Sequence, residues 1–197
     1  MASVLLPVVI GSYLILKIKP SQLTGEVTYV KSDIDNKSYL VQNKKDSKEG
    51  ANTLAQINQR LTKLKEYLTS NKSKYPEFDK PISLVTLRFN GNNITEGNLN
   101  YDYTTYTVNK GQEINFCLRT RNENDQIHDI NLLTFVAIHE LAHIASVQND
   151  PGHKTDEFKR NFEFLLKRAI EIGVYNYVDY AAAPVMYCGT LVNSTPV

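Results

Sequence analysis

The stretch His139–His153, which reads HELAHIASVQNDPGH, is the most informative part of this sequence. Residues four apart on a helix lie one turn above each other on the same face, so His139 and His143 can point at one metal ion. Glu140 is offset beside them, where it can take a proton from water without being a ligand. HExxH on a helix is therefore an arrangement that places two imidazoles and a general base at one zinc ion.

The flanking residues agree with a helix at this position. Asp129 and Asn131 are both available as its N-cap, and Asn149, Asp150, Pro151 and Gly152 should end it and turn the chain. The apolar residues around the motif predict a mostly buried helix, and they are Leu132, Leu133, Val136, Ala137, Ile138, Leu141, Ile144, Ala145 and Val147.

A third histidine follows directly after this turn. His153 can fold back toward the helix, and catalytic zinc needs three protein ligands and an open fourth position. The chain has four histidines, and three of them fall in this stretch. The alternatives are an ordinary helix carrying His139 and His143, and an exposed loop histidine at 153. His128 lies in a polar stretch before the helix, and we interpret it as an ordinary surface histidine.

The motif resembles a group of known zinc peptidases. HELAH at 139–143, then Gly152-His153, then Phe158 at the start of another helix, is similar to the WLM and SprT-like domains. The resemblance covers roughly residues 114–189. It implies a zincin-like fold, zinc bound by His139, His143 and His153, and Glu140 as the catalytic base. The C-terminal residues Tyr180, Pro184 and 187–189 more faintly resemble WLM-like proteins of large DNA viruses.

The composition of the chain excludes some classes of protein. The chain has 197 residues, 42% of them hydrophobic, which is enough for one domain with a real core. Its net charge of +1 argues against extended binding to nucleic acid, which requires clustered lysines and arginines. Cys117 and Cys188 are too few for a disulfide scaffold, and we expect buried small apolar residues rather than a bridge.

The N-terminus carries a second signal. Val4–Ile18 reads VLLPVVIGSYLILKI and would span roughly 22 Å as a helix. This is shorter than a hydrocarbon layer of about 30 Å. A helix that starts at Met1 would be long enough to cross it. We favour a single-pass membrane anchor over a buried element or a signal peptide. Because Lys17, Lys19 and Lys31 follow the apolar run, the bulk of the chain is expected on the cytosolic side.

The region between these two signals predicts alternating short elements. Residues 21–50 should form a linker or a small β element, with strand pieces near Val27, Tyr29 and 39–41. The spacing of Leu54, Ile57, Leu61, Leu64 and Leu68 predicts a packed helix that ends near Asn71. Further elements should follow this helix. They are a solvated loop at 72–80, a buried strand at 82–89 closed by the turn 90–93, a hairpin of 104–108 with 113–118, and a last helix at about 155–172 capped by Gly173.

Together these elements predict an α+β fold with a zincin-like mixed sheet and an HExxH helix. The expected domains are an anchor at 1–20, a linker or small β element at 21–50 and a metallopeptidase domain at 51–197. The strand 113–118 is the candidate edge on which an extended peptide substrate could add. Tyr175, Tyr177, Tyr180 and Tyr187 crowd the C-terminus, but none is assigned as a stabiliser of the oxyanion.

The expected function is a membrane-anchored, zinc-dependent peptidase that acts on peptide or protein substrates. The alternative is a membrane-attached structural or assembly protein that contacts neighbouring proteins, such as those of a virion, and keeps the zincin scaffold without peptidase activity. An intact Glu140 favours the enzyme, because a structural zinc site does not need a general base and usually has a fourth protein ligand.

Overall fold

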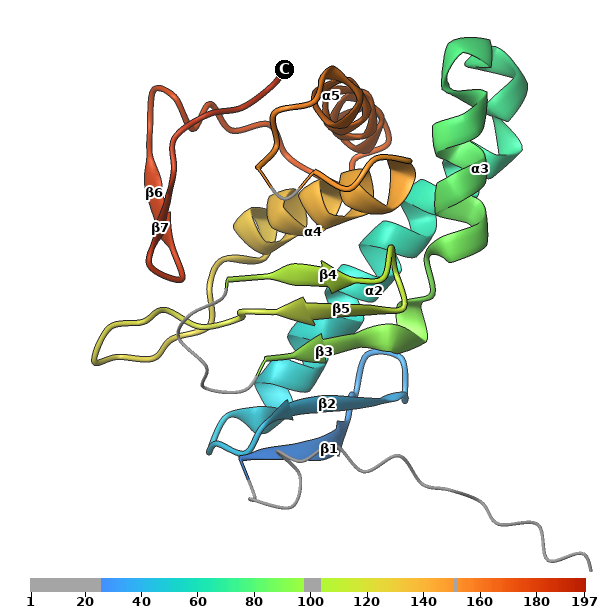
Figure 1. Cartoon of the computed structure of the whole chain (residues 1–197). Coiled ribbons are helices and arrows are strands. Elements are labelled where there is room, and N and C mark those ends of the chain that lie inside the picture. The colour runs from blue at the N-terminus through green and yellow to red at the C-terminus, as the bar shows by residue number, and fades with distance from the viewer. Residues whose placement is uncertain (1–25, 98–103, 151) are drawn as a thin grey trace, which may run out of the picture.

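The computed structural model describes residues 26–97, 104–150 and 152–197 of the chain. A long helix lies behind a row of short strands, two further helices lie across one end of this row, and the chain finishes in a hairpin (Figure 1). Val4–Ile18, the expected anchor, lies outside the described residues. Within the described ranges, no helix is both long enough and apolar enough to cross a membrane.

The first described element is a β-hairpin. Strand β1 (Val27–Lys31) pairs antiparallel with β2 (Ser38–Gln42), so the strand pieces expected there are confirmed. Four of the five residues of β2 are buried, because the strand packs against the following helix and lies beside the next sheet. That helix begins at Ser47, so the expected boundary at residue 50 falls inside a helix that packs on the hairpin.

Helix α2 (Ser47–Ser70) forms the centre of the fold (Figure 1). The stripe predicted from the spacing of its apolar residues is confirmed: Leu54, Ile57, Leu61, Leu64 and Leu68 are all fully buried. The stripe contacts strands on one side and the HExxH helix on the other, so α2 ties the two halves of the domain into one core.

The buried strand expected at 82–89 is wrong, because the chain forms helix α3 (Asp79–Arg88) there. Ile82, Val85 and Phe89 are buried while Leu87 is 82% exposed, which is the spacing of a helix face and not of a strand. The apolar run is too short for its periodicity to distinguish a helix from a strand. The expected loop before it contains two 3-10 turns, η1 (Lys72–Lys74) and η2 (Pro76–Phe78).

A three-stranded sheet follows the turn η3 (Gly91–Asn93). Strand β3 (Ile94–Glu96) runs parallel to β5 (Glu113–Phe116), and β4 (Tyr106–Val108) pairs antiparallel with β5. The predicted hairpin is therefore confirmed.

The prediction that the 113–118 strand is the edge of the sheet is wrong. The strand order is β3-β5-β4, so β5 is central and β4 is the edge. The parallel partner of β5 comes from a distant part of the chain, and local sequence carries no information about that pairing.

Helix α4 (Ile130–Ala145) carries the first two histidines of the stretch, and His153 lies in the turn between α4 and helix α5 (Asp156–Glu171). Helix α4 is capped by Asp129, whose carboxylate accepts hydrogen bonds from the backbone N–H groups of Asn131 and Leu132. Helix α5 is capped by Thr155, whose hydroxyl accepts a hydrogen bond from Phe158 N–H. Gly173 follows α5 with a φ of 67°, as expected for a glycine cap. The HExxH helix and the last helix are both confirmed.

A third hairpin lies near the C-terminus, β6 (Val185–Tyr187) with β7 (Thr190–Val192). Cys188, in the turn of this hairpin, forms a disulfide with Cys117. The expectation of two unbridged cysteines is therefore wrong. The partners are 71 residues apart in sequence, and only the tertiary fold brings their Cα atoms to 6.4 Å.

Candidate metal centre and cleft

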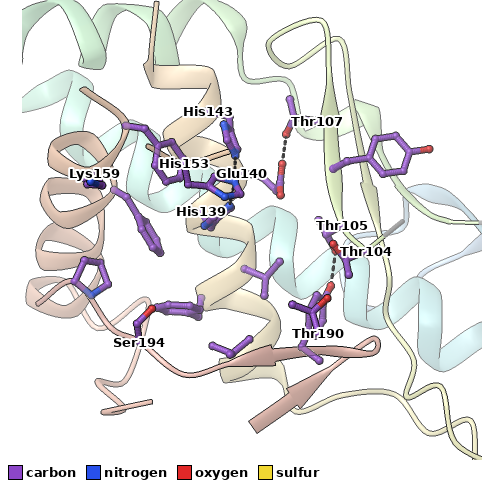
Figure 2. A pocket seen from close by; sticks show the side chains of 18 of the residues that line it. Thr104, Thr105, Thr107, His139, Glu140, His143, His153, Lys159, Thr190 and Ser194 are labelled. Carbon is purple, nitrogen blue, oxygen red and sulfur yellow. Dashed lines mark hydrogen bonds between the residues drawn. The ribbon is translucent and has the colours of Figure 1, made fainter. Parts of the chain in front are cut away.

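The three predicted ligands converge on one point. Nε2 of His153 lies 3.1 Å from Nε2 of His139 and 3.0 Å from Nε2 of His143 (Figure 2). One ring nitrogen from each residue lies within 4.8 Å of the other two. Two nitrogens bound to one tetrahedral zinc at about 2.0–2.1 Å would be roughly 3.3 Å apart. The geometry therefore fits a metal ion held by three imidazoles.

His153 reaches this point from an unusual backbone conformation. Its φ is 54°, in the left-handed region that costs a non-glycine residue about 1 kcal/mol or more. Its N–H donates to the carbonyl of Asp150 at 3.2 Å, and the carboxylate of Asp150 accepts from Thr155 N–H at 2.6 Å. The turn is thus fixed to the N-terminus of α5, which holds the third histidine in place.

Helix α5 also fixes the end of α4. The carboxylate of Glu157 accepts hydrogen bonds from Val147 N–H at 2.8 Å and from Gln148 N–H at 3.1 Å. The amide of Asn161 donates to the hydroxyl of Ser146 at 3.0 Å. Sequence analysis missed both residues, because a polar residue on a surface helix carries no sign of the distant backbone that it will bind.

Two aromatic residues of α5 form a wall beside the histidines. The ring of Phe158 lies 4.4 Å from that of His143, and the ring of Phe162 lies 5.2 Å from that of His139. Burial lowers the pKa of His139 to about 3 and that of His143 to about 4, and the neighbouring histidines act in the same direction. Both rings are therefore neutral near pH 7 with lone pairs available to a metal.

Glu140 lies next to the histidines but is not among the three clustered ligands. It is only 4% exposed, and its Oε2 accepts a hydrogen bond of 2.7 Å from the hydroxyl of Thr107 on β4 (Figure 2). Burial raises the pKa of Glu140 to about 7, whereas the hydrogen bond from Thr107 acts in the opposite direction. Such a carboxyl can exchange a proton near neutral pH, as a general base must.

These groups open into a cleft of about 1140 Å³. Residues of α4 and α5 line it together with residues 104–107 around β4 and residues 190–196 near the C-terminus. Lys110, in the turn between β4 and β5, also lines the cleft, and its ammonium group donates to the carbonyls of Gln148 at 2.6 Å and His143 at 3.3 Å. An extended chain could lie along this cleft past the histidines.

Of the four C-terminal tyrosines, Tyr187 lines the cleft. Its hydroxyl donates to the carbonyl of Cys117 at 2.7 Å and hydrogen-bonds the hydroxyl of Thr105. It therefore connects the C-terminal hairpin to the residues just before β4 and just after β5. His128 is not part of the histidine cluster. Its Nε2 accepts a hydrogen bond of 3.4 Å from Cys188 N–H, so it supports the same hairpin.

Comparison with known proteins places the chain among viral proteins. It is 43% identical over 169 residues to the uncharacterized protein R325 of Acanthamoeba polyphaga mimivirus, covering 86% of this chain and 84% of that protein. It is 32% identical over 98 residues to the uncharacterized protein 136R of Invertebrate iridescent virus 6, which is 49% of this chain and 53% of that protein.

A third relative is the uncharacterized protein 042R of Invertebrate iridescent virus 3, with 40% identity over 75 residues, or 38% of this chain and 44% of that protein. No family model and no solved structure matches the chain. The match to the mimivirus protein extends over most of both sequences. The chain therefore belongs to the same protein family as protein R325 of mimivirus.

Proposed function

We propose that this protein is a zinc-dependent peptidase. The observation that carries the proposal is the convergence of three imidazole nitrogens beside a buried carboxylate at the floor of an open cleft. Zinc is the metal that suits three histidines with a neighbouring glutamate in HExxH spacing. The resemblance to WLM and SprT-like domains points to the same chemistry.

Each residue of the site has a distinct part in this reaction. His139, His143 and His153 would hold the metal, which would act as a Lewis acid and lower the pKa of a nearby water. Glu140 would accept the proton that this water loses and pass it to the leaving amine. Thr107 would hold the carboxylate of Glu140 on the cleft side of α4 through its hydrogen bond.

The shape of the site favours a peptide substrate. Strand β4 is the edge of its sheet, and residues 104–107 line the cleft. The side of β4 that does not pair with β5 faces α4, on which the HExxH motif lies (Figure 1). An extended peptide could pair with this edge through its backbone and so pass the metal in a fixed orientation, largely independent of its sequence.

The location that we propose for this activity is a membrane. The support is the apolar segment Val4–Ile18, which includes Lys17 near its end and is followed by Lys19. The family relationship to a mimivirus protein supports a viral setting, in which the substrate or the neighbours of this protein could be other viral proteins.

Metal analysis combined with a cleavage assay tests the proposal. Purified protein should contain about one zinc per chain and should cleave an unfolded protein such as casein. Glu140→Gln should keep the zinc and lower the cleavage rate by about a hundredfold or more, because it removes proton transfer. If the wild type holds zinc but cleaves nothing, and Glu140→Gln impairs assembly or membrane association, the structural role replaces the enzymatic one.

A further inference from the structure

The two ends of the cleft differ in chemistry. Asn109, Lys110 and Asn149 line one end. Near the other end the lining includes five apolar residues, Phe135 and Val136 from α4, Phe162 from α5, and Leu191 and Val192 from β7, beside the polar residues Thr190 and 193–195. We call these five residues the apolar pocket. The histidines lie between the two ends, because Phe135 and Val136 precede them on α4 whereas Asn149 follows them.

The apolar pocket begins directly beside the metal centre. The ring of Phe162 lies 5.2 Å from that of His139 and 5.3 Å from that of Phe135, so one aromatic surface connects them. Phe135 and Val136 are one helical turn, about 5.4 Å, from His139 and Glu140. An extended peptide advances about 3.3 Å per residue. The pocket is therefore one or two residues away from a peptide bond placed at the histidines.

None of the five residues of the apolar pocket carries a charge. The ammonium of Lys110 binds carbonyls at the end of α4, and Glu140 is bound by Thr107. Lys159 also lines the cleft, at an exposed position of α5. A charged substrate side chain placed among the five pocket residues would lose part of its hydration without an ionic partner from the pocket itself, and this cost disfavours it relative to an apolar side chain.

We infer that the apolar pocket selects substrates with a large apolar side chain, such as leucine, phenylalanine or methionine, within two residues of the bond that is cut. The inference rests on the proposed peptidase function and deepens it. Backbone pairing with β4 tolerates many sequences, so the pocket supplies the discrimination that the strand edge lacks. Removing a few methylenes from a side chain in such a pocket changes affinity by about tenfold or more.

Two exposed leucines offer a matched pair of variants for the test. Leu191 in β7 is 50% exposed and Leu87 in α3 is 82% exposed, so a polar substitution at either position should leave the fold intact. Leu191 lines the cleft, whereas Leu87 is not among the lining residues.

Peptide binding to the full chain carrying Glu140→Gln measures the preference without turnover. The probes are fluorescein-labelled decapeptides of alanine and serine with one central leucine, phenylalanine, aspartate or lysine, followed by fluorescence anisotropy. Leucine and phenylalanine peptides should bind at least tenfold more tightly than the aspartate peptide. Leu191→Glu should remove this preference and Leu87→Glu should keep it. Val136→Thr, which conserves shape inside the pocket, should lower the affinity for the leucine peptide several-fold.

The outcomes separate the pocket from the peptidase. Equal binding of all four peptides, or equal effects of Leu191→Glu and Leu87→Glu, would overturn the proposed selection by the apolar pocket. If the leucine peptide binds through Leu191 but the wild type cleaves none of the peptides, the pocket is supported and the peptidase is not. If the wild type cleaves the aspartate and leucine peptides at equal rates, the peptidase is supported and the pocket is overturned.

Discussion

The hydroxyl of Thr107 donates a 2.7 Å hydrogen bond to Oε2 of Glu140 and so joins the edge strand β4 to the HExxH helix. The two residues are 33 positions apart in sequence and come from different layers of the fold. Through this contact, the strand on which we place the substrate also sets the position of the proposed general base. Thr107 is thus a positioning residue for Glu140.

Replacing Thr107 should change the pH dependence of cleavage. A general base works only when ionised, so the rate should fall as the pH drops through the pKa of Glu140, which burial raises to about 7. The hydrogen bond lowers that pKa by stabilising the ionised form, so Thr107→Val should move the acid limb of the rate profile to higher pH, by roughly one unit. Thr107→Ser should restore the wild-type profile. An unchanged profile in Thr107→Val would show that the contact does not act on the base.

Single histidine substitutions should distinguish the three proposed metal ligands from His128, which is not a ligand, by their effect on bound zinc. His153→Ala should reduce bound zinc well below one per chain, because two imidazoles hold the ion far less tightly than three. His128→Ala is the matched control, since His128 is half-buried outside the cluster and its loss should leave the zinc in place. Metal content after dialysis at neutral pH is the measurement. Equal zinc loss in both variants would contradict the assignment of the ligands.

Removing the disulfide should destabilise the domain. Cys117 and Cys188 close a segment of 71 residues, and the loss of such a bridge costs about 2–5 kcal/mol by the loop-closure argument. The double variant Cys117→Ser/Cys188→Ser should therefore unfold at lower urea concentration than the wild type. Adding a reductant should lower the midpoint of the wild type and leave that of the double variant unchanged. Coincident wild-type midpoints with and without reductant would contradict the bridge.

The N-terminal segment should hold the protein on membranes. Full-length protein should stay with the membrane fraction through alkaline extraction, whereas a chain that starts at Ser21 should be soluble and folded. A truncated chain that is insoluble and lacks helical circular dichroism would assign the segment to the core of the domain.

Glycosylation tests the orientation of the chain. Sequons occur at Asn36, Asn71, Asn93 and Asn193, and the lysines after the apolar run predict that all four stay unmodified on the cytosolic side. The disulfide instead favours the lumenal side, because such bridges persist mainly in oxidising compartments. Glycosylation of the exposed Asn36 or Asn193 would place the domain on the lumenal side.

Local spacing in the sequence was sufficient to predict several parts of this protein. The HExxH helix, the stripe of α2 and the reversal before His153 all follow from periods of three or four residues and from turn-forming residues, and the sequence offered Asp129 as one of two caps for that helix. Such signals are strong because each involves neighbours on one helix face or within one turn. For the same reason, the sequence was enough to group the three proposed ligands as one cluster.

The features that join distant segments depend on the tertiary structure. The order of the strands, with β4 at the edge, rests on a parallel pairing of β3 with β5 that leaves no local trace. The disulfide, the contact between Thr107 and Glu140, and the hydrogen bonds of Glu157 each connect residues whose own neighbourhoods are ordinary. The prediction of a strand in place of α3 is wrong for a related reason: its short apolar run fits either period, and packing against the rest of the core selects the helix.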